Sequence, residues 1–439
     1  MANSIRNQHD ILEKLNIAAL NPMQQEAIAI IGKTANTVLL SPTGTGKTLA
    51  FLLPLIDSLD AELMEVQALI LLPSRELAIQ IEQVVRNMGS GFKVNAVYGG
   101  RPMSQDKLEL KHTPAILIGT PGRIADHFSA ERFSKASIKT LILDEFDKTL
   151  ETGFEKEMNE IIHQLPHLTK RILTSATQGV EIPRFVGLET PTILNYIKDK
   201  KASRLTVGTV VAPDKNKLQT LVELLQHIGN EPGIIFCNFK DSIEHVSAYF
   251  DQYGINYTCF SGGMEQRDRE RSLIKFRNGT CQVLVATDLA ARGIDIPEIQ
   301  FIVHYELPRT VEEFTHRNGR TARVKAKGTA YVLQWEKERL PEFIEKDQPI
   351  VVSKKSAHKP QLWETLFISG GRKDKISKGD IAGLFFKQGG INKDQLGVIE
   401  LKQDCAFVAV PLSIASGLVE KLNNTRLKKK KVRVNILQS

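Results

Sequence analysis

A glycine-rich run at residues 41–48 has the clearest chemical meaning in the chain. It follows the apolar residues 38–40 and opens an apolar-periodic segment at residues 49–59. A strand, a glycine-rich turn and a helix in this order aim backbone N–H groups at one anion. Lys47 can reach the β- and γ-phosphates of a nucleotide, and the Thr48 hydroxyl can take a Mg2+ position. The predicted phosphate-binding loop consists of Ser41, Pro42, Thr43, Gly44, Thr45, Gly46, Lys47 and Thr48.

An acidic pair, Asp144 and Glu145, comes directly after the apolar residues 140–143. Ligands of parallel sheets bind beyond the carboxyl ends of the strands, so this pair is expected near the phosphate loop. Asp144 can hold Mg2+ together with Thr48, directly or through water. Glu145 can orient and deprotonate an attacking water. An acidic pair after a strand is also common as plain surface, but its expected neighbourhood favours the catalytic interpretation.

Three arginines fall within residues 316–323. Arg320 and Arg323 are spaced i, i+3 and would share one helix face. Guanidinium groups can stabilise charge on a transferring phosphoryl group. Because this run lies in the second half of the chain, we expect ATP to sit between two halves whose closure assembles the site. An arginine-rich solvated helix is the alternative.

Short apolar runs that alternate with helical patterns must position these groups. Continuous apolar strands between helices are typical of parallel sheets covered on both faces. Two sets of runs therefore predict two doubly wound α/β domains. The runs are residues 38–40, 68–72, 115–118, 140–143 and 171–174, then 233–237, 257–260, 282–286, 301–304 and 329–333.

Polar stretches at residues 198–204 and 345–360 mark the expected boundaries. After the second one, short strands are expected at residues 366–369 and 407–410. The expected organisation is a first domain, a second domain, a linker and a small third domain. Their residues are 1–204, 205–345, 346–362 and 363–439.

Composition narrows the class of protein. The 439 residues are 42% hydrophobic and 25% charged, which describes an ordinary globular chain. Apolar runs stay below the roughly 18 residues that span a bilayer, and the first ten residues lack the apolar core of a signal peptide. The four cysteines lie far apart without a C-x-x-C pair, which predicts reduced thiols. We therefore expect a cytoplasmic protein with no membrane contact and no disulfide partner.

The positive charge is concentrated at the C-terminal end. Residues 351–439 carry 17 Lys and Arg against 7 Asp and Glu, whereas the first 350 residues carry 41 against 43. This split predicts a separate polyanion-binding module. A solvated basic surface is the alternative.

Residues 1–340 resemble a DEAD-box RNA helicase of superfamily 2, because its motifs occur here in family order. The resemblance implies two RecA-like domains that bind ATP and Mg2+. Gln24 would read the adenine edge, and Gly293 and Asp295 of motif V would contact the nucleotide. The family's RNA path would include Arg75, Gly99, Gly100, Thr120, Arg123, Gln266, Arg269 and Thr287. Residues that couple hydrolysis to unwinding would be Asp147, Ser175, Thr177 and His316.

The chain departs from the family pattern at two places. Residues 144–147 read Asp-Glu-Phe-Asp, so Phe146 replaces the family's alanine. We expect its ring to fill a pocket against the core or against the helix after motif III. No aromatic residue precedes Phe51, so the upstream aromatic that stacks on adenine in this family is missing.

Residues 365–381 resemble the C-terminal RNA-binding domain of DbpA-type bacterial helicases, a divergent RRM. The predicted fold is thus two tandem α/β domains followed by a small α+β RRM-like domain. Phe367 and Phe407 would offer a stacking platform for unpaired bases, or would be core residues. The basic run could contact phosphates or be a solvated face. It consists of Lys428, Lys429, Lys430 and Lys431.

The resemblance predicts an ATP-dependent RNA helicase that remodels short duplexes. In the DbpA-type subgroup the C-terminal domain captures a hairpin of large-subunit ribosomal RNA. The expected partner is therefore large-subunit ribosomal RNA or its assembly intermediates, and the expected process is ribosome assembly. One alternative is a general mRNA or cold-shock remodelling helicase. Another is an RNA-clamping scaffold with weak ATPase activity.

Overall fold

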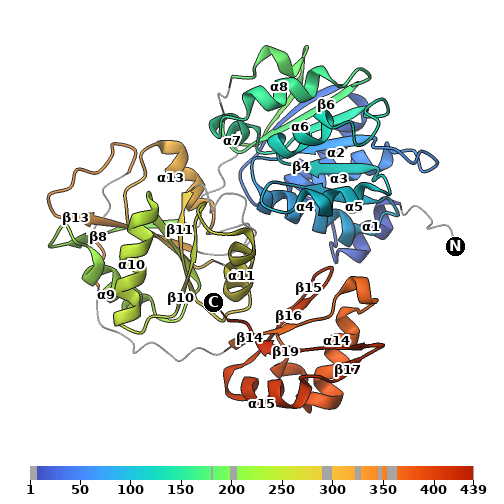
Figure 1. Cartoon of the computed structure of the whole chain (residues 1–439). Coiled ribbons are helices and arrows are strands. Elements are labelled where there is room, and N and C mark those ends of the chain that lie inside the picture. The colour runs from blue at the N-terminus through green and yellow to red at the C-terminus, as the bar shows by residue number, and fades with distance from the viewer. Residues whose placement is uncertain are drawn as a thin grey trace. The chain divides into compact units, whose positions relative to one another are not determined.

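The computed structural model describes residues 7–178, 181–197, 205–288, 299–321, 328–344, 349–352 and 363–438. The chain divides near residue 204 into two compact units (Figure 1). The first unit holds one parallel sheet, and the second holds another parallel sheet and a small antiparallel one.

Seven parallel strands form the sheet of the first unit, in the order β3-β4-β2-β5-β6-β1-β7. Their bounds are β1 Asn36–Leu40, β2 Ala68–Leu71, β3 Val94–Val97, β4 Ile116–Gly119, β5 Thr140–Leu143, β6 Lys170–Ser175 and β7 Thr192–Asn195. The helices are α1 Gln8–Lys14, α2 Pro22–Lys33, α3 Lys47–Asp57, α4 Arg75–Met88, α5 Met103–Leu110, α6 Pro121–Ser129, α7 Phe146–Glu151 and α8 Glu155–His163.

Apolar cores cover both faces of this sheet. Along β2, Ile70 belongs to one buried cluster, whereas Leu69 and Leu71 belong to the other. Along β5, Ile142 joins the first cluster and Leu141 the second. Successive strand residues point to opposite faces, so this alternation confirms the doubly wound α/β fold expected from the continuous apolar runs.

Six parallel strands form the larger sheet of the second unit, in the order β10-β11-β9-β12-β13-β8. The strands are β8 Leu205–Ala212, β9 Gly233–Cys237, β10 Tyr257–Phe260, β11 Val283–Thr287, β12 Phe301–His304 and β13 Gly328–Trp335. Helices α9 Leu218–Ile228, α10 Lys240–Gln252, α11 Gln266–Arg277 and α13 Val311–Asn318 accompany them. The second α/β fold is therefore confirmed.

A four-stranded antiparallel sheet, ordered β15-β16-β14-β19, completes the second unit. The sheet and two helices form a small domain, which consists of β14 Trp363–Ile368, α14 Lys378–Leu384, β15 Ile399–Leu401, β16 Ala406–Pro411, α15 Leu412–Leu422 and β19 Val434–Ile436. Leu366 and Ile368 of β14 lie in the domain's own core, as does Leu418 of α15. The chain order and the antiparallel sheet confirm a small α+β domain. A two-stranded hairpin, β17 Arg426–Leu427 and β18 Lys430–Lys431, precedes β19.

Within the described ranges, no helix is both long and apolar enough to cross a membrane.

Candidate active site

The run at residues 41–48 forms the turn between β1 and α3. Gly44 and Gly46 have φ angles of 78° and 87°, a left-handed conformation that side chains other than glycine rarely adopt. A Cβ atom at Gly46 would lie 2.4 Å from Nε2 of Gln24. Both observations explain why the turn carries glycine at these positions.

Lys47 lies folded back into this loop. Its Nζ donates to the backbone oxygens of Ser41 (2.5 Å) and Pro42 (3.3 Å). The Oγ of Ser41 and the Oγ1 of Thr45 are 2.8 Å apart. The ammonium group is therefore held by carbonyl oxygens on the loop, the surroundings in which a phosphate oxygen could compete for it.

Gln24 connects the loop to α2. Its backbone N–H and side chain form a capping box with Asn21. Its Oε1 accepts from the Asn21 N–H (3.0 Å), and its Nε2 donates to the Gly46 oxygen (3.2 Å). Asn21 in turn donates through Nδ2 to the Thr45 oxygen (3.0 Å). Both the oxygen and the nitrogen of the Gln24 side-chain amide form hydrogen bonds within the protein here. Recognition of an adenine edge by Gln24 therefore stays a prediction.

Asp144 lies at the carboxyl end of β5, and β6 alone separates that strand from β1. The carboxylate is 4% exposed and accepts a hydrogen bond from the Thr174 hydroxyl of β6. Burial raises the pKa of Asp144, although the Thr174 hydrogen bond and the charge of Lys47 oppose the rise. A carboxylate this deeply buried gains stability from a nearby cation.

Glu145 has a backbone conformation that is rare for a residue with a side chain. Its φ and ψ are both 48°, in the left-handed region, at the start of α7. Its N–H donates to the Thr174 hydroxyl at 3.3 Å. Backbone strain of this kind clusters at functional sites, where the surrounding structure holds it in place.

The structure brings three residues predicted to couple hydrolysis to unwinding into one hydrogen-bonded group. The Thr177 hydroxyl donates to Oδ2 of Asp147 at 2.7 Å. The Ser175 hydroxyl donates to the Thr177 backbone oxygen at 2.9 Å and accepts from the Thr177 N–H at 3.0 Å. Strand β6 and helix α7 are thereby joined at the strand ends that carry the phosphate loop and Asp144.

The segments expected on the RNA path of the first unit lie close together. A Cβ at Gly100, whose φ is 86°, would lie 2.3 Å from Nη1 of Arg75, so this guanidinium lies directly against Gly100. Thr120 is the N-cap residue of α6, although its side chain makes no capping hydrogen bond. The Arg123 guanidinium does not point outward, because its Nε donates to Oδ2 of Asp106 at 2.7 Å.

In the second unit, Gln266 and Arg269 lie in the first turns of α11, and both are buried. The Arg269 guanidinium carbon lies 4.7 Å from the centre of the Phe260 ring. Thr287 ends β11. His316 and Arg320 are buried at the end of α13 and in the turn that follows it.

Arg317, which was not among the predicted site residues, has the most enclosed charge in this region. Its side chain is fully buried, and its Nε and Nη2 donate to the two carboxylate oxygens of Asp288 at 2.7 and 2.5 Å. It also donates to the Glu306 backbone oxygen (2.8 Å) and to Oδ1 of Asn238 (2.7 Å). Arg317 thus ties α13 to the carboxyl ends of β9, β11 and β12. The sequence indicated the importance of the arginine run, but Asp288, which pairs with Arg317, lies 29 residues away in the sequence.

Three predicted site residues, Gly293, Asp295 and Arg323, lie outside the described residues.

The two aromatic rings predicted to stack bases contact each other across β14 and β16. The ring centroids of Phe367 and Phe407 are 5.8 Å apart. Phe407 is 7% exposed and Phe367 is half-buried, because both pack in a cluster with Ile274 of α11. In this structure the rings lie in a contact between the small domain and the second α/β domain.

Polar groups extend the same contact. Arg277 at the end of α11 donates through Nε and Nη2 to the Glu400 carboxylate of β15 at 2.7 and 2.8 Å. The hydroxyls of Thr280 and Thr365 are 2.7 Å apart, and Asn278 Nδ2 donates to Thr365 at 3.1 Å. Base stacking on this face would require its separation from α11.

The basic run lies on the hairpin β17–β18. Lys428 pairs with Asp380 at 2.8 Å, and Lys430 pairs with Asp374 at 2.7 Å. Lys429 and Lys431 are exposed. Half of the run therefore has acidic partners inside the domain, and half projects from its surface.

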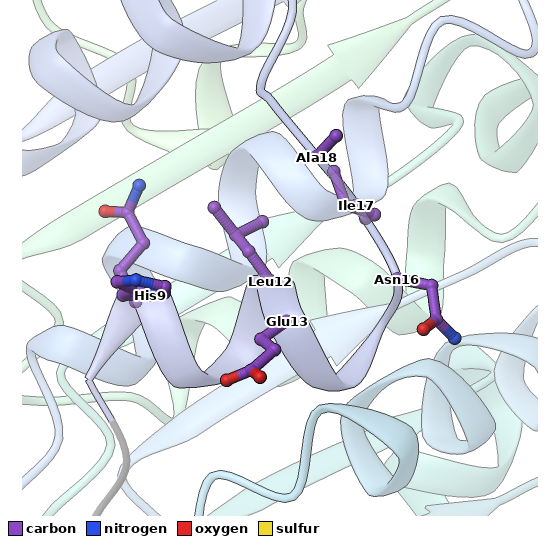
Figure 2. A pocket seen from close by; sticks show the side chains of 7 residues that line it. His9, Leu12, Glu13, Asn16, Ile17 and Ala18 are labelled. Atoms are coloured by element: carbon purple, nitrogen blue, oxygen red, sulfur yellow. The ribbon is translucent and has the colours of Figure 1, made fainter.

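A hollow of about 830 Å3 lies along α1 (Figure 2). His9, Leu12 and Glu13 line it from the helix, and Asn16 and Ile17 line it from the following turn. None of the residues predicted to bind phosphate lines this hollow.

Three family models match the chain in succession. They are a DEAD/DEAH box helicase at residues 21–185, a helicase conserved C-terminal domain at 216–325, and a DbpA RNA binding domain at 365–436. An ATP-dependent RNA helicase DbpA from Bacillus subtilis is 31% identical, over 97% of this chain and 97% of its own. The ATP-dependent RNA helicase DbpA of Escherichia coli is also 31% identical, over 97% and 96%.

A solved structure is also similar to this chain. The structure of S. cerevisiae Dbp5 bound to RNA and ADP BeF3 has 25% identity and a TM-score of 0.67, covering 75% of this chain and 88% of that one.

Proposed function

Because this chain belongs to the DbpA-like DEAD-box ATP-dependent RNA helicases, we propose that it remodels large-subunit ribosomal RNA during ribosome assembly. Its ATPase and helicase domains span the two parallel sheets, and its RNA-binding domain is the small antiparallel one.

The proposed ATP site uses the strand ends of the first unit. Lys47 binds the β- and γ-phosphates, Asp144 and Thr48 hold Mg2+, and Glu145 takes the proton of the attacking water. The buried Asp144, with its raised pKa and its neighbour Lys47, fits a position that a cation completes. Bound Mg2+ would neutralise charge on the phosphates.

The remaining Mg2+ ligands would be phosphate oxygens and water. Among the described residues, no group of three or more His, Cys, Asp or Glu side chains is arranged to hold a metal. A site with one carboxylate and one hydroxyl suits Mg2+, which keeps several waters and is commonly bound through substrate phosphates.

The strained backbone of Glu145 is the single observation that best supports catalysis at this site. A left-handed glutamate costs about 1–3 kcal/mol, and such a cost persists where the surrounding structure enforces it. Here Thr174 contacts both Asp144 and Glu145, so one hydroxyl holds the metal ligand and the base in register. Arg320 and Arg323 are proposed to stabilise the charge that develops on the phosphoryl group.

Targeting is proposed to reside in the small domain. Its match to the DbpA RNA binding domain supports this, as do the 17 basic against 7 acidic residues of positions 351–439, which include part of the linker. Phosphate contacts carry no sequence information, so the two α/β domains would bind RNA of any sequence. The exposed Lys429 and Lys431 are the proposed phosphate contacts of the basic hairpin.

Trapping in cells tests this proposal. Glu145→Gln removes the base and leaves Asp144, so the variant should hold ATP and RNA without turnover. Crosslinking followed by RNA sequencing should then recover large-subunit ribosomal RNA enriched over mRNA. Enrichment of mRNA instead would favour a general remodelling helicase and reject the ribosomal role. Lys47→Ala, which should not bind ATP productively, is the matched control.

A further inference from the structure

A buried carboxylate connects two segments assigned above to the RNA path. Asp106 of α5 is 0% exposed. Its Oδ2 accepts from Nε of Arg123 (2.7 Å) and from Nε2 of His127 (3.0 Å), and its Oδ1 accepts from Nε of Arg101. Arg101 follows Gly100 directly, and Arg123 lies in the first turn of α6, whose N-cap residue is Thr120. One side chain therefore fixes both turns.

The neighbouring histidine shows that Asp106 is an acceptor on all sides. Nδ1 of His127 lies 3.0 Å from Nη1 of Arg132, and a guanidinium group can only donate. Nδ1 must therefore accept, so Nε2 carries the hydrogen and donates to Asp106. Burial raises the pKa of Asp106, but the His127 hydrogen bond and the charges of Arg101 and Arg123 outweigh it and lower the pKa overall. The carboxylate is ionised.

The two arginines are engaged inside the unit. Nη2 of Arg101 donates to the Ala96 oxygen (3.0 Å) and to the Glu109 carboxylate (2.9 Å). Nη2 of Arg123 donates to the backbone oxygen of Arg101. Their side chains are only 12% and 10% exposed. Contacts from these segments to phosphates would therefore come from the backbone and not from these two guanidinium groups.

We propose that Asp106 is a positioning residue for RNA, which sets the spacing between the Gly99–Gly100 turn and the N-terminus of α6. It acts through Arg101 and Arg123, which serve as braces and not as phosphate ligands. This inference rests on the proposed RNA role of Gly99, Gly100 and Thr120.

The sign of one mutation separates positioning from simple electrostatics. Asp106→Asn removes a negative charge beside two arginines, and added positive charge alone strengthens RNA binding. Loss of the brace weakens RNA binding, because the two turns no longer hold their spacing. The two explanations therefore predict opposite changes.

The experiment measures ATPase rate against RNA concentration at saturating ATP for the full chain. Asp106→Asn should raise the RNA concentration for half-maximal rate at least about tenfold, since a misplacement of about 1 Å can cost a factor of about 100. The kcat at saturating RNA and the KM for ATP should stay near their wild-type values. Arg101→Gln combined with Asp106→Asn restores the net charge and should remain weak.

Two controls address stability. Leu194 is buried in β7, at the opposite edge of the sheet from β3. Leu194→Ala should lower the melting temperature without changing the RNA dependence. If Asp106→Asn does not fold, His127→Phe removes one donor to Asp106 without changing formal charge and should shift the RNA dependence in the same direction.

An unchanged or lower half-maximal RNA concentration for Asp106→Asn would overturn the positioning role, as would an equal rise in Leu194→Ala. Gly100→Ala, whose Cβ would collide with Arg75, tells which assignment failed. If Gly100→Ala weakens RNA and Asp106→Asn does not, the positioning role alone is wrong. If neither variant weakens RNA, the assignment of these turns to the RNA path is wrong as well.

Discussion

Phe146 offers a direct test of how this chain accommodates its departure from the family's alanine. The ring is 2% exposed and belongs to the apolar cluster that contains Leu143 of β5, Leu173 of β6 and Ile161 of α8. The expectation that it packs against the core is thereby confirmed. Its truncation should leave a cavity next to the strand ends that carry the predicted catalytic residues.

The expected cost follows from burial. Phe→Ala in a packed core costs about 3–5 kcal/mol. For a unit of about 200 residues, each kcal/mol lowers the melting temperature by about 2–4 °C, so Phe146→Ala should lower it by roughly 6–20 °C. Because Asp147 and its Thr177 contact adjoin the cavity, the coupling of RNA binding to hydrolysis should also weaken.

Thermal unfolding of the full chain, followed by near-UV circular dichroism, measures this shift. Met64→Ala is the control, because that side chain is 79% exposed and its truncation should leave the melting temperature nearly unchanged. A melting temperature for Phe146→Ala equal to that of the control would show that the ring is not packed in the core.

Three further variants test the site and its braces. Glu145→Gln should abolish ATP hydrolysis yet retain ATP and RNA in filter binding, since Asp144 is intact; a near-normal kcat would reject Glu145 as the base. Asp288→Asn leaves the buried guanidinium of Arg317 without its counter-charge, so it should lower the free energy of unfolding by about 3–5 kcal/mol. Urea titration measures this change, and an unchanged midpoint would contradict the burial of the pair. The pKa of Asp106 lies below its ordinary 3.8, so its stabilising effect is complete above that pH and is lost as pH falls through the folded-state pKa. The stability difference between wild type and Asp106→Asn should therefore shrink below about pH 4, and a difference that stays constant in acid would contradict an ionised, paired carboxylate.

Several strands were predictable because short apolar runs mark them in the sequence. The runs at residues 140–143, 233–237, 257–260 and 301–304 form strands with the same bounds. Strands β3, β7 and β8 were not expected. Strand β3 carries the polar Asn95 within only four residues, and β7 is mostly unburied, so neither gives a continuous apolar signal. Strand β8 follows a charged stretch and lies at a sheet edge.

The phosphate loop and the acidic pair could be predicted because each is local in sequence and follows an apolar strand. The buried ion pairs of Asp106 and Arg317 could not be predicted. Asp106 lies in a short, mostly polar helix, where a lone carboxylate resembles a solvated residue until the fold brings Arg123 and His127 to it. Arg317 likewise depends on Asp288, which only the sheet order places beside it. Ion-pair partners that are far apart in the sequence cannot be identified from the local residue pattern around either one.

The contact between α11 and the small domain was also not predictable. Phe367 and Phe407 lie on the sheet face away from the domain's own core, as a stacking platform requires. Ile274, which packs with them, lies within an α11 sequence that reads as an ordinary charged helix.

The central claim is that RNA targeting resides in the small domain and hydrolysis in the two α/β domains. Its most direct test compares RNA-stimulated ATPase of the full chain with that of a variant lacking residues 351–439. Each is measured on large-subunit ribosomal RNA and on length-matched random RNA, over a range of salt. We predict that the truncated chain hydrolyses ATP with either RNA at high concentration, loses the preference for ribosomal RNA, and shows a flatter salt dependence. Equal discrimination by the truncated and full chains would contradict the claim and place specificity in the α/β domains.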